Sequence, residues 1–562
     1  MTMPAAIAPS RVPRAMGAVL IAGIVLATLT DAIAGTALSL GRGDIIGDTY
    51  ATPDEFAWLD VGYTSLKLMT FMAAPWLIGR VDLRSLVVGS TLAMGAACAL
   101  AAATARLDIL IALRGVQGIS GGALLVGGQT LVFLVYPRHR QPFLQALFAM
   151  GSVVAPAAIA PALQGWLLDS KSWTWIFLSV VPVALGAAGL MLLAPPVAVP
   201  KTIRRQFDWI GFSLISAALF CFTYVLSQGS RWDWFEEPRI LWLTLAGTAA
   251  LLAFAGRQIF GGRSDGLLDF TVFLSADFAF AFVVSFVAGA ALFGSGYLIP
   301  SFAISVLDFR PTDAGLLLLP SGGLFILSLL LSAFLMQGLR VPPTATVPFG
   351  ILMMMVAMWM LSGSTGESGS DDMMAAILLR GFSLGFLFLS ITLIAFEKLE
   401  NSNLASGISL FNAGRQIGGL AGVAGLQTLI HDNVMANATV LAAHVTPGVA
   451  AVSERLAMVA AMLTERGMDA AEANRLALSL LFKAVTGQST VIAFDTAFNA
   501  VALLFVGAAP VLVAIKVGLS RHAKSRATQA SLKPVSGPTL RVGKAAKASL
   551  ADGVAPDCEL AS

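Results

Sequence analysis

Long apolar runs separated by short polar segments fill the chain from residue 16 to about residue 519. Runs such as Met16–Leu40, Leu86–Thr104 and Val491–Val517 are long enough to cross about 30 Å of hydrocarbon, which takes about 20 helical residues. Because lipid offers no hydrogen-bond partners, each crossing segment must satisfy its own backbone, and the pattern predicts helices. The chain is therefore expected to be an all-α polytopic membrane protein.

Hydropathy and loop punctuation predict about fourteen spans. They are expected near residues 17–40, 58–79, 85–104, 107–133, 143–167, 174–194, 209–229, 239–256, 276–299, 313–335, 346–362, 373–396, 406–430 and 491–517. An even number of spans places both termini on one side. The short loops on that side carry arginine and lysine and the opposite loops carry acids, so both termini are expected in the cytoplasm, beneath a bacterial-type inner membrane.

The amino-acid composition also indicates a membrane protein and narrows the possible functions. Hydrophobic residues make up 57% of the 562 residues and charged residues 12%, about half the charged share of a soluble domain. The net charge of +3 is small and indicates membrane orientation rather than nucleic-acid binding. All four histidines lie outside the spans, and the three cysteines show no metal or disulfide spacing. We therefore expect no catalytic centre, no metal and no cofactor.

The segments outside the spans each have two interpretations. The basic N-terminus, residues 1–16, resembles the start of a signal peptide, but the run that follows is too long for one and predicts an uncleaved first span. Residues 520–562 are basic and predict a disordered cytoplasmic tail that solubilises the end of the chain or touches anionic lipid. Residues 431–490 predict one or two external amphipathic helices, either a cap over the last spans or a docking surface.

Three segments carry recognisable motifs. Leu110–Thr130 has an arginine followed by Gln-Gly and small residues, Gly151–Trp175 is rich in glycine and proline, and Leu410–Gly425 reads LFNAGRQIGGLAGVAG. Their order, together with Asp31 in the first span and Asp208 at the start of the seventh, closely resembles the major facilitator superfamily and its fourteen-helix drug:proton antiporter branch.

The resemblance implies two six-helix bundles, residues 17–200 and 263–519, with two extra membrane helices over residues 201–262. Substrate would bind between the bundles near the midplane, and the bundles would rock to alternate access. The matching residues are Arg114 and Gln117 in the fourth helix, and Gly151, Pro156, Pro161 and Gly165 in the helix-five antiporter motif.

The chain also departs from the family pattern. The gating loop between the second and third helices keeps only Asp82 and Arg84 as remnants. Gln164 replaces a glycine of the antiporter motif, and Thr36 replaces an asparagine after the first-helix aspartate.

Two interior charges suggest a proton switch. Counted from the outer helix ends, Asp31 lies roughly 14 Å deep and Arg114 roughly 10 Å deep. A lone carboxylate in that position costs about 2.5–3.5 kcal/mol, which protonation or pairing with Arg114 would relieve. We expect Asp31 to carry the coupled proton and Arg114 to tune it; the alternative is a static ion pair that fixes helix packing.

Other interior polar residues are candidates for the cavity. Gln117 either joins the Arg114 network or makes a simple interhelical hydrogen bond. Arg415 and Asn412 either contact substrate or hold the bundle interface together. Lys67 either lines the cavity or snorkels to the interface, and Arg380 is expected to snorkel.

The balance of interior charges suggests a substrate class. Asp31 is the one acid expected well inside the bilayer, against four bases: Lys67, Arg114, Arg380 and Arg415. This excess of positive charge favours neutral or anionic amphiphiles over cations.

The sequence thus predicts a proton-coupled exporter of small amphiphilic compounds. One alternative is an uptake permease for an organic anion. A second is a lipid-linked transferase that uses the acids Asp44, Asp48, Asp54 and Glu55. A third is a non-transporting sensor or scaffold that uses residues 431–490 and the C-terminal tail. A periplasmic adaptor is a candidate partner, because the resembled branch includes members that use one.

Overall fold

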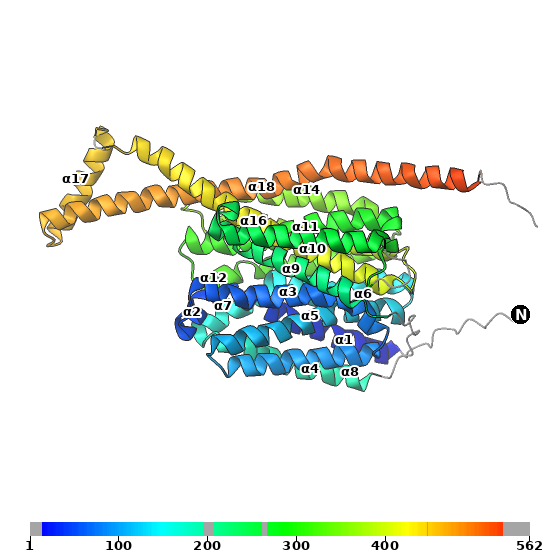
Figure 1. The fold of residues 1–562 in the computed structure, drawn as a ribbon. Coiled ribbons are helices and arrows are strands. Elements are labelled where there is room, and N and C mark those ends of the chain that lie inside the picture. The colour runs from blue at the N-terminus through cyan, green and yellow to red at the C-terminus, as the bar shows by residue number, and fades with distance from the viewer. Residues whose placement is uncertain (1–13, 195–205, 261–266, 447, 532–562) are drawn as a thin grey trace, which may run out of the picture.

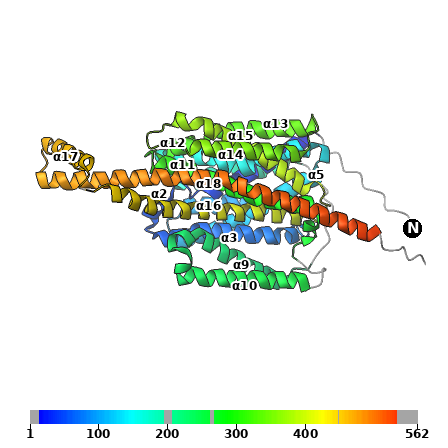
Figure 2. The same ribbon diagram turned by 90° about the horizontal axis from the view of Figure 1, so that it is seen from above.

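The computed structural model describes residues 14–194, 206–260, 267–446 and 448–531, with side chains up to residue 508. Within these residues the chain folds into helices joined by turns and short loops. Figures 1 and 2 show most of these helices side by side, with their axes roughly parallel. The expectation of an all-α polytopic membrane protein is confirmed.

The helices α1–α8 form the first half of the fold, and α11–α18 form the second half. The first half supplies α1 (Arg14–Thr36), α2 (Arg42–Thr49), α3 (Pro53–Ile78), α4 (Leu83–Ala102), α5 (Leu107–Val135), α6 (Gln141–Ala149), α7 (Ala160–Ser170) and α8 (Thr174–Leu193). The two extra helices are α9 (Trp209–Gln228) and α10 (Pro238–Phe260). The second half supplies α11 (Ala276–Ser305), α12 (Pro311–Leu316), α13 (Leu319–Gln337), α14 (Pro343–Leu361), α15 (Ser370–Phe396), α16 (Leu404–His444), α17 (Ala450–Glu465) and α18 (Ala470–Ser531).

Each predicted span falls on one of these helices or on two or three helical pieces that follow one another in the chain. In the described part of the chain, 12 helical segments are long and apolar enough to cross a membrane. The remaining two predicted spans lie in α3 and α16, which are long enough but less apolar. Both helices carry polar residues that face the protein interior, which explains their lower hydropathy.

Local sequence signals set the helix boundaries. Thr52 and Glu55 form a capping box at the start of α3: the Thr52 amide donates to the Glu55 carboxylate at 2.8 Å, and the Glu55 amide donates to the Thr52 hydroxyl at 3.3 Å. Asp82 caps α4 by accepting from the Ser85 amide at 3.0 Å.

The predicted fifth span is a composite of three pieces. A π-helical stretch, Met150–Ile159, separates α6 from α7 and contains Pro156, while Pro161 lies in the first turn of α7. Proline lacks an amide hydrogen and so weakens the regular helical ladder. The two prolines thus account for the irregular backbone of this segment.

The two extra helices, α9 and α10, lie at one edge of the molecule beside α3 (Figure 2). The predicted domain limits at residues 200 and 262 fall outside the described residues, as do most of the 1–16 segment and residues 532–562 of the tail. The start of that predicted disordered tail, residues 520–531, is the helical end of α18.

Residues 431–490 are predicted to form an external loop. Much of this segment instead continues two membrane helices without a break. α16 continues to His444, and α18 begins at Ala470 before running into the last span. With α17 they form a projection beyond the helix bundle (Figure 1). α17 packs on the start of α18 through Ala460, Ala473 and Ala477. This segment therefore extends away from the spans and does not cap them.

Candidate functional site

A buried ion pair lies where α1 and α3 meet. Lys67 Nζ lies 2.8 Å from Asp31 Oδ2 and 3.0 Å from Oδ1, and the Tyr63 hydroxyl donates to Oδ1 at 2.7 Å. The Lys67 and Asp31 side chains are only 8% and 6% exposed. Leaving either charge buried alone would cost about 3–5 kcal/mol, so each side chain stabilises the other.

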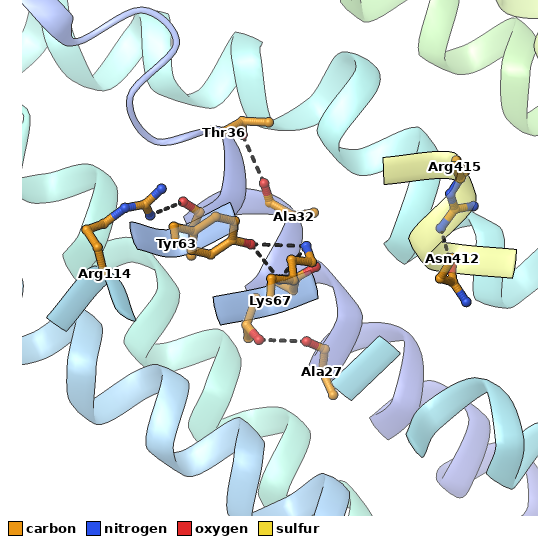
Figure 3. A network of polar contacts seen from close by, with 11 residues as sticks. Ala27, Ala32, Thr36, Tyr63, Lys67, Arg114, Asn412 and Arg415 are labelled. Atoms are coloured by element: carbon orange, nitrogen blue, oxygen red, sulfur yellow. Dashed lines mark hydrogen bonds and ion pairs between the residues drawn. The ribbon is translucent and has the colours of Figure 1, made fainter. Parts of the chain in front are cut away.

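Arg114 on α5 lies next to this pair and is 1% exposed. Its Nη1 donates to the Ala34 carbonyl of α1 at 2.7 Å and to Gln117 Oε1 at 2.9 Å. Its guanidinium lies 4.3 Å from the centre of the Tyr63 ring. Figure 3 shows Tyr63 between Arg114 and Lys67. Tyr63 thus contacts Asp31 through its hydroxyl and Arg114 through its ring face.

The predicted pairing of Asp31 with Arg114 is wrong. Lys67 reaches the carboxylate from α3, while the Arg114 guanidinium turns toward the Ala34 carbonyl. The alternative in which Lys67 snorkels to the interface is also wrong, because its ammonium is buried on Asp31. The predicted contact between Arg114 and Gln117 is present.

Sequence reasoning missed two members of this cluster. Tyr63 connects the charges, and Asp60 is half-buried and close enough to interact electrostatically with Arg114. Asp60, Tyr63 and Lys67 follow a three- and four-residue spacing, which places them on one face of α3. Polar residues at that spacing within an apolar helix were the signal available in the sequence.

Glycines in the arginine motif allow the cluster to form. A side chain at Gly118 would collide with the Tyr63 carbonyl, one at Gly121 with the Asp31 carboxylate, and one at Gly122 with the Lys67 carbonyl. These glycines let α5 lie directly against the polar faces of α1 and α3.

A second polar group joins the two halves of the chain. Asn412 on α16 donates to Gln129 Oε1 on α5 at 3.0 Å, and Arg415 donates to Asn412 Oδ1 at 2.6 Å. Gln129 donates in turn to Gln145 Oε1 at 3.3 Å. Arg415, Gln129 and Gln145 line one small pocket together with Phe148, Ala149, Ser152, Val153, Phe388, Leu389 and Thr392. Sequence reasoning identified Arg415 and Asn412 but missed both glutamines.

The helix-five motif lies where the two halves meet. Side chains added at Gly165 and at Gly315 would collide with the backbones of Pro311 and Pro161 respectively, so α7 and α12 touch backbone to backbone. The Thr312 hydroxyl donates to the Gly165 carbonyl at 2.9 Å. Gly151 packs instead on the Val25 carbonyl of α1. Pro161 and Gly165 therefore contact the second half, whereas Gly151 contacts the first.

Residues that depart from the resembled pattern also have structural partners. Gln164 Nε2 donates to the Thr36 hydroxyl at 2.8 Å. The two residues that differ from the family pattern therefore bond to each other and link α7 to α1. In the remnant of the gating loop, Arg84 donates to the carbonyls of Met191 and Leu192 at 2.8 Å each. Arg84, like the α4 cap Asp82, thus acts within the first half of the chain.

Comparison with known families agrees with this arrangement. A family model described as the Major Facilitator Superfamily matches residues 20–423, which is most of the chain. The chain belongs to the major facilitator superfamily. It is therefore a multi-pass membrane transporter and not an enzyme.

Curated relatives cover most of this transporter. It is 26% identical to the colistin resistance protein EmrB of Acinetobacter baumannii over 88% of this chain and 95% of that protein. It is also 26% identical to the multidrug export protein EmrB of Escherichia coli over 71% of this chain and 77% of that protein. A multidrug resistance protein B homolog of Mycobacterium tuberculosis is 26% identical over 74% and 77% of the two chains. These relatives agree with the fourteen-helix branch.

The transferase alternative is thereby excluded, and three of its four proposed acids have structural partners in the transporter. Trp173 Nε1 donates to Asp48 at 2.7 Å, Arg231 pairs with Asp54 at 3.1 Å, and Glu55 caps α3. Among the described residues, no group of three or more His, Cys, Asp or Glu side chains could hold a metal ion.

Two further charged residues of the transporter are buried or half-buried. Arg380 on α15 is 1% exposed, so the expectation that it snorkels is wrong. Asp495 is half-buried in α18 near the start of the predicted last span, and the expectation that Asp31 is the one acid well inside the bilayer stays a prediction. The Oδ1 atom of Asp495 has no hydrogen-bond partner among the described residues.

Proposed function

We propose that the chain is a proton-coupled exporter of small amphiphilic compounds. The single observation that supports the coupling is the buried Asp31–Lys67 ion pair, which Tyr63 connects to Arg114. Buried ionisable residues in membrane helices are costly and mark ion or substrate pathways. The printed names of the relatives, which describe multidrug export and colistin resistance, support export as the direction.

In this proposal the carboxylate of Asp31 accepts the transported proton. Protonation removes its negative charge, so the Lys67 ammonium loses its counter-ion in a buried place. The pair then separates, and the contacts of α1 with α3 and α5 change. Loss of the proton on the opposite side restores the pair, which returns the transporter to its starting conformation.

We propose that substrate binds at the small pocket between the two halves, which must widen to admit it, because it now has room for little more than a water molecule. Aromatic and aliphatic side chains supply apolar surface there, while Arg415, Gln129 and Gln145 supply polar contacts. Such a lining suits amphiphiles. A cation in the pocket favours neutral or anionic compounds, and we infer that permanent cations are poor substrates.

We further propose that both termini face the cytoplasm, since the loops on that side are the basic ones. The tail contains Cys558, while Cys98 and Cys221 are buried. A membrane-impermeant maleimide should therefore label the protein in inside-out vesicles but not in intact cells, and Cys558→Ser should abolish labelling. Labelling in intact cells would reverse the orientation.

A periplasmic adaptor would dock on the projection formed by the end of α16, α17 and the start of α18. Its surface exposes Met435, Val440, Met458, Met462 and Phe482 well beyond the spans. The double variant Met458→Glu/Phe482→Glu should reduce export from whole cells while leaving transport by the purified protein in vesicles unchanged. Unchanged export from cells would contradict an adaptor at this surface.

The proposed function is tested in inside-out vesicles that hold a pH gradient. A panel of anionic, neutral and cationic amphiphiles is added to vesicles with wild-type protein, Asp31→Asn or the control Asp495→Asn. Dissipation of the gradient by neutral or anionic compounds in wild type and control, and its loss in Asp31→Asn, is the expected result. A response only in vesicles of the opposite orientation would favour the uptake permease, and a response only to permanent cations would contradict the substrate class.

A further inference from the structure

Arg380 lies buried in the second half of the chain without a counter-charge. Its Nε donates to the Ser295 hydroxyl on α11 at 2.7 Å, while its Nη2 has no hydrogen-bond partner. Among the described residues, no carboxylate lies within ion-pair distance of this guanidinium. A buried arginine normally has an acid or several acceptors, because an isolated buried charge is costly.

Internal symmetry relates the helices around Arg380 to the helices around Arg114. Gly118 of α5 packs on the Tyr63 carbonyl of α3, and Gly381 of α15 packs in the same way on the Ser321 carbonyl of α13. Four residues later, Gly122 and Gly385 repeat the close contact with the same partner helices. α15 and α13 therefore correspond to α5 and α3.

A second pair of glycine contacts relates α11 to α1. Gly151 packs on the Val25 carbonyl, and Gly418 packs on the Phe286 carbonyl. Nine residues after these carbonyls stand Ala34, which accepts from Arg114, and Ser295, which accepts from Arg380. Both arginines thus reach equivalent positions on the first helix of their own half.

The Asp31–Lys67 ion pair of the first half has no equivalent in the second. Six residues after Phe286 stands Leu292, in the position that Asp31 holds after Val25. Four residues after Ser321 stands Phe325, in the position of Lys67. Leu292 and Phe325 are both buried. The second half therefore has apolar residues in place of the ion pair. Its buried arginine stands one residue before the packed glycine, where α5 has Gln117, and Ile377 stands where α5 has Arg114.

We propose that Arg380 binds a monovalent anionic group, with Ser295 positioning its guanidinium. The group is either the ionised acid of an exported amphiphile or an inorganic halide. Binding of an amphiphile's acid rests on the proposed function and makes it more specific: the second half would then be the part that recognises the acid group. Gly296 places no side chain beside Nη2: a Cβ at this residue would stand 3.6 Å from that atom, at ordinary contact distance.

Binding is measured on the full-length transporter in lipid nanodiscs, by thermal unfolding and by titration. The probes are 2-naphthoate, its uncharged analogue 2-naphthamide, and chloride against gluconate. Wild type should be stabilised by 2-naphthoate or by chloride, and Arg380→Gln should lose that stabilisation while Arg380→Lys keeps part of it. Selective loss of the 2-naphthoate effect would assign the site to substrate, and selective loss of the chloride effect would assign it to halide.

Two comparisons separate this site from a structural role. Without added anion, Arg380→Gln should unfold at the same or a higher temperature than wild type, because it removes an uncompensated charge. Ser295→Ala should keep the anion effect in weakened form. If Arg380→Gln is folded and retains both anion effects, or if neither anion stabilises wild type, the proposal is overturned. Failure of proton-coupled transport in the vesicle assay would contradict the proposed function without changing these binding results.

Discussion

At the scale of single residues, Asp31 and Lys67 depend on each other. Their atoms meet at 2.8 Å in a place that is almost fully buried. Tyr63 donates to the same carboxylate, so three side chains from two helices respond to one proton. This arrangement makes the ion pair both a packing element and the candidate proton carrier, and substitutions can separate the two roles.

Lys67→Met should destabilise the transporter by about 3–5 kcal/mol, because Asp31 is left charged and buried. Adding Asp31→Asn should restore most of that stability, since neither charge then remains. Thermal unfolding of the single and double variants in nanodiscs checks this, with the exposed Lys398→Met as control. Equal stability of Lys67→Met and the double variant would contradict mutual dependence.

At the scale of helices, α5 is positioned by its glycines. Gly121 lies so close to Asp31 that a methyl group would overlap the carboxylate. The arginine motif therefore does more than place Arg114: its small residues bring α5 against the polar surfaces of α1 and α3. A spacing of three or four residues between small side chains is the general means of such close helix contact.

Gly121→Ala should displace the Asp31 carboxylate and lower transport, with a loss of stability of about 1–3 kcal/mol from overpacking. The matched control is Gly89→Ala on α4, where an added methyl group would meet no atom within 4 Å. That control should unfold and transport like wild type. The measurements are the export rates and the unfolding temperatures of the two variants. Equal values for both variants would show that α5 can move away from α1 and α3 without loss of function.

At the scale of the whole molecule, the two halves touch near both ends of the bundle. At one end Thr312 donates through its backbone amide to Asp169 at 3.2 Å, and at the other the Phe133 and Phe396 rings lie 5.3 Å apart. The pocket with Arg415 lies on the interface between the halves. Alternating access requires these two contacts to open in turn.

A disulfide across one contact should stop transport. In Asp169→Cys/Thr312→Cys the two thiols would bridge α7 and the start of α12, holding that end closed. Oxidation should abolish export and reduction should restore it, measured in vesicles of a Cys558→Ser background. Full export by the oxidised, fully cross-linked protein would show that this end does not open.

Sequence reasoning located the helices but missed most of the side-chain partners. Hydropathy located the spans because lipid demands apolar segments of a fixed length. It could not tell whether Arg114 or Lys67 faces Asp31, since that depends on helix rotation and on where α5 approaches α1. It also could not show that Gln129 meets Asn412, because these residues lie 283 positions apart.

The central claim is that the Asp31–Lys67 pair couples proton movement to transport. The direct measurement uses proteoliposomes containing wild type or Asp31→Asn/Lys67→Met, and compares transport driven by a pH gradient with exchange of labelled substrate at equal pH. We predict that the double variant keeps exchange but loses uphill transport. Uphill transport by the double variant would contradict the account, as would loss of exchange together with uphill transport in a folded protein.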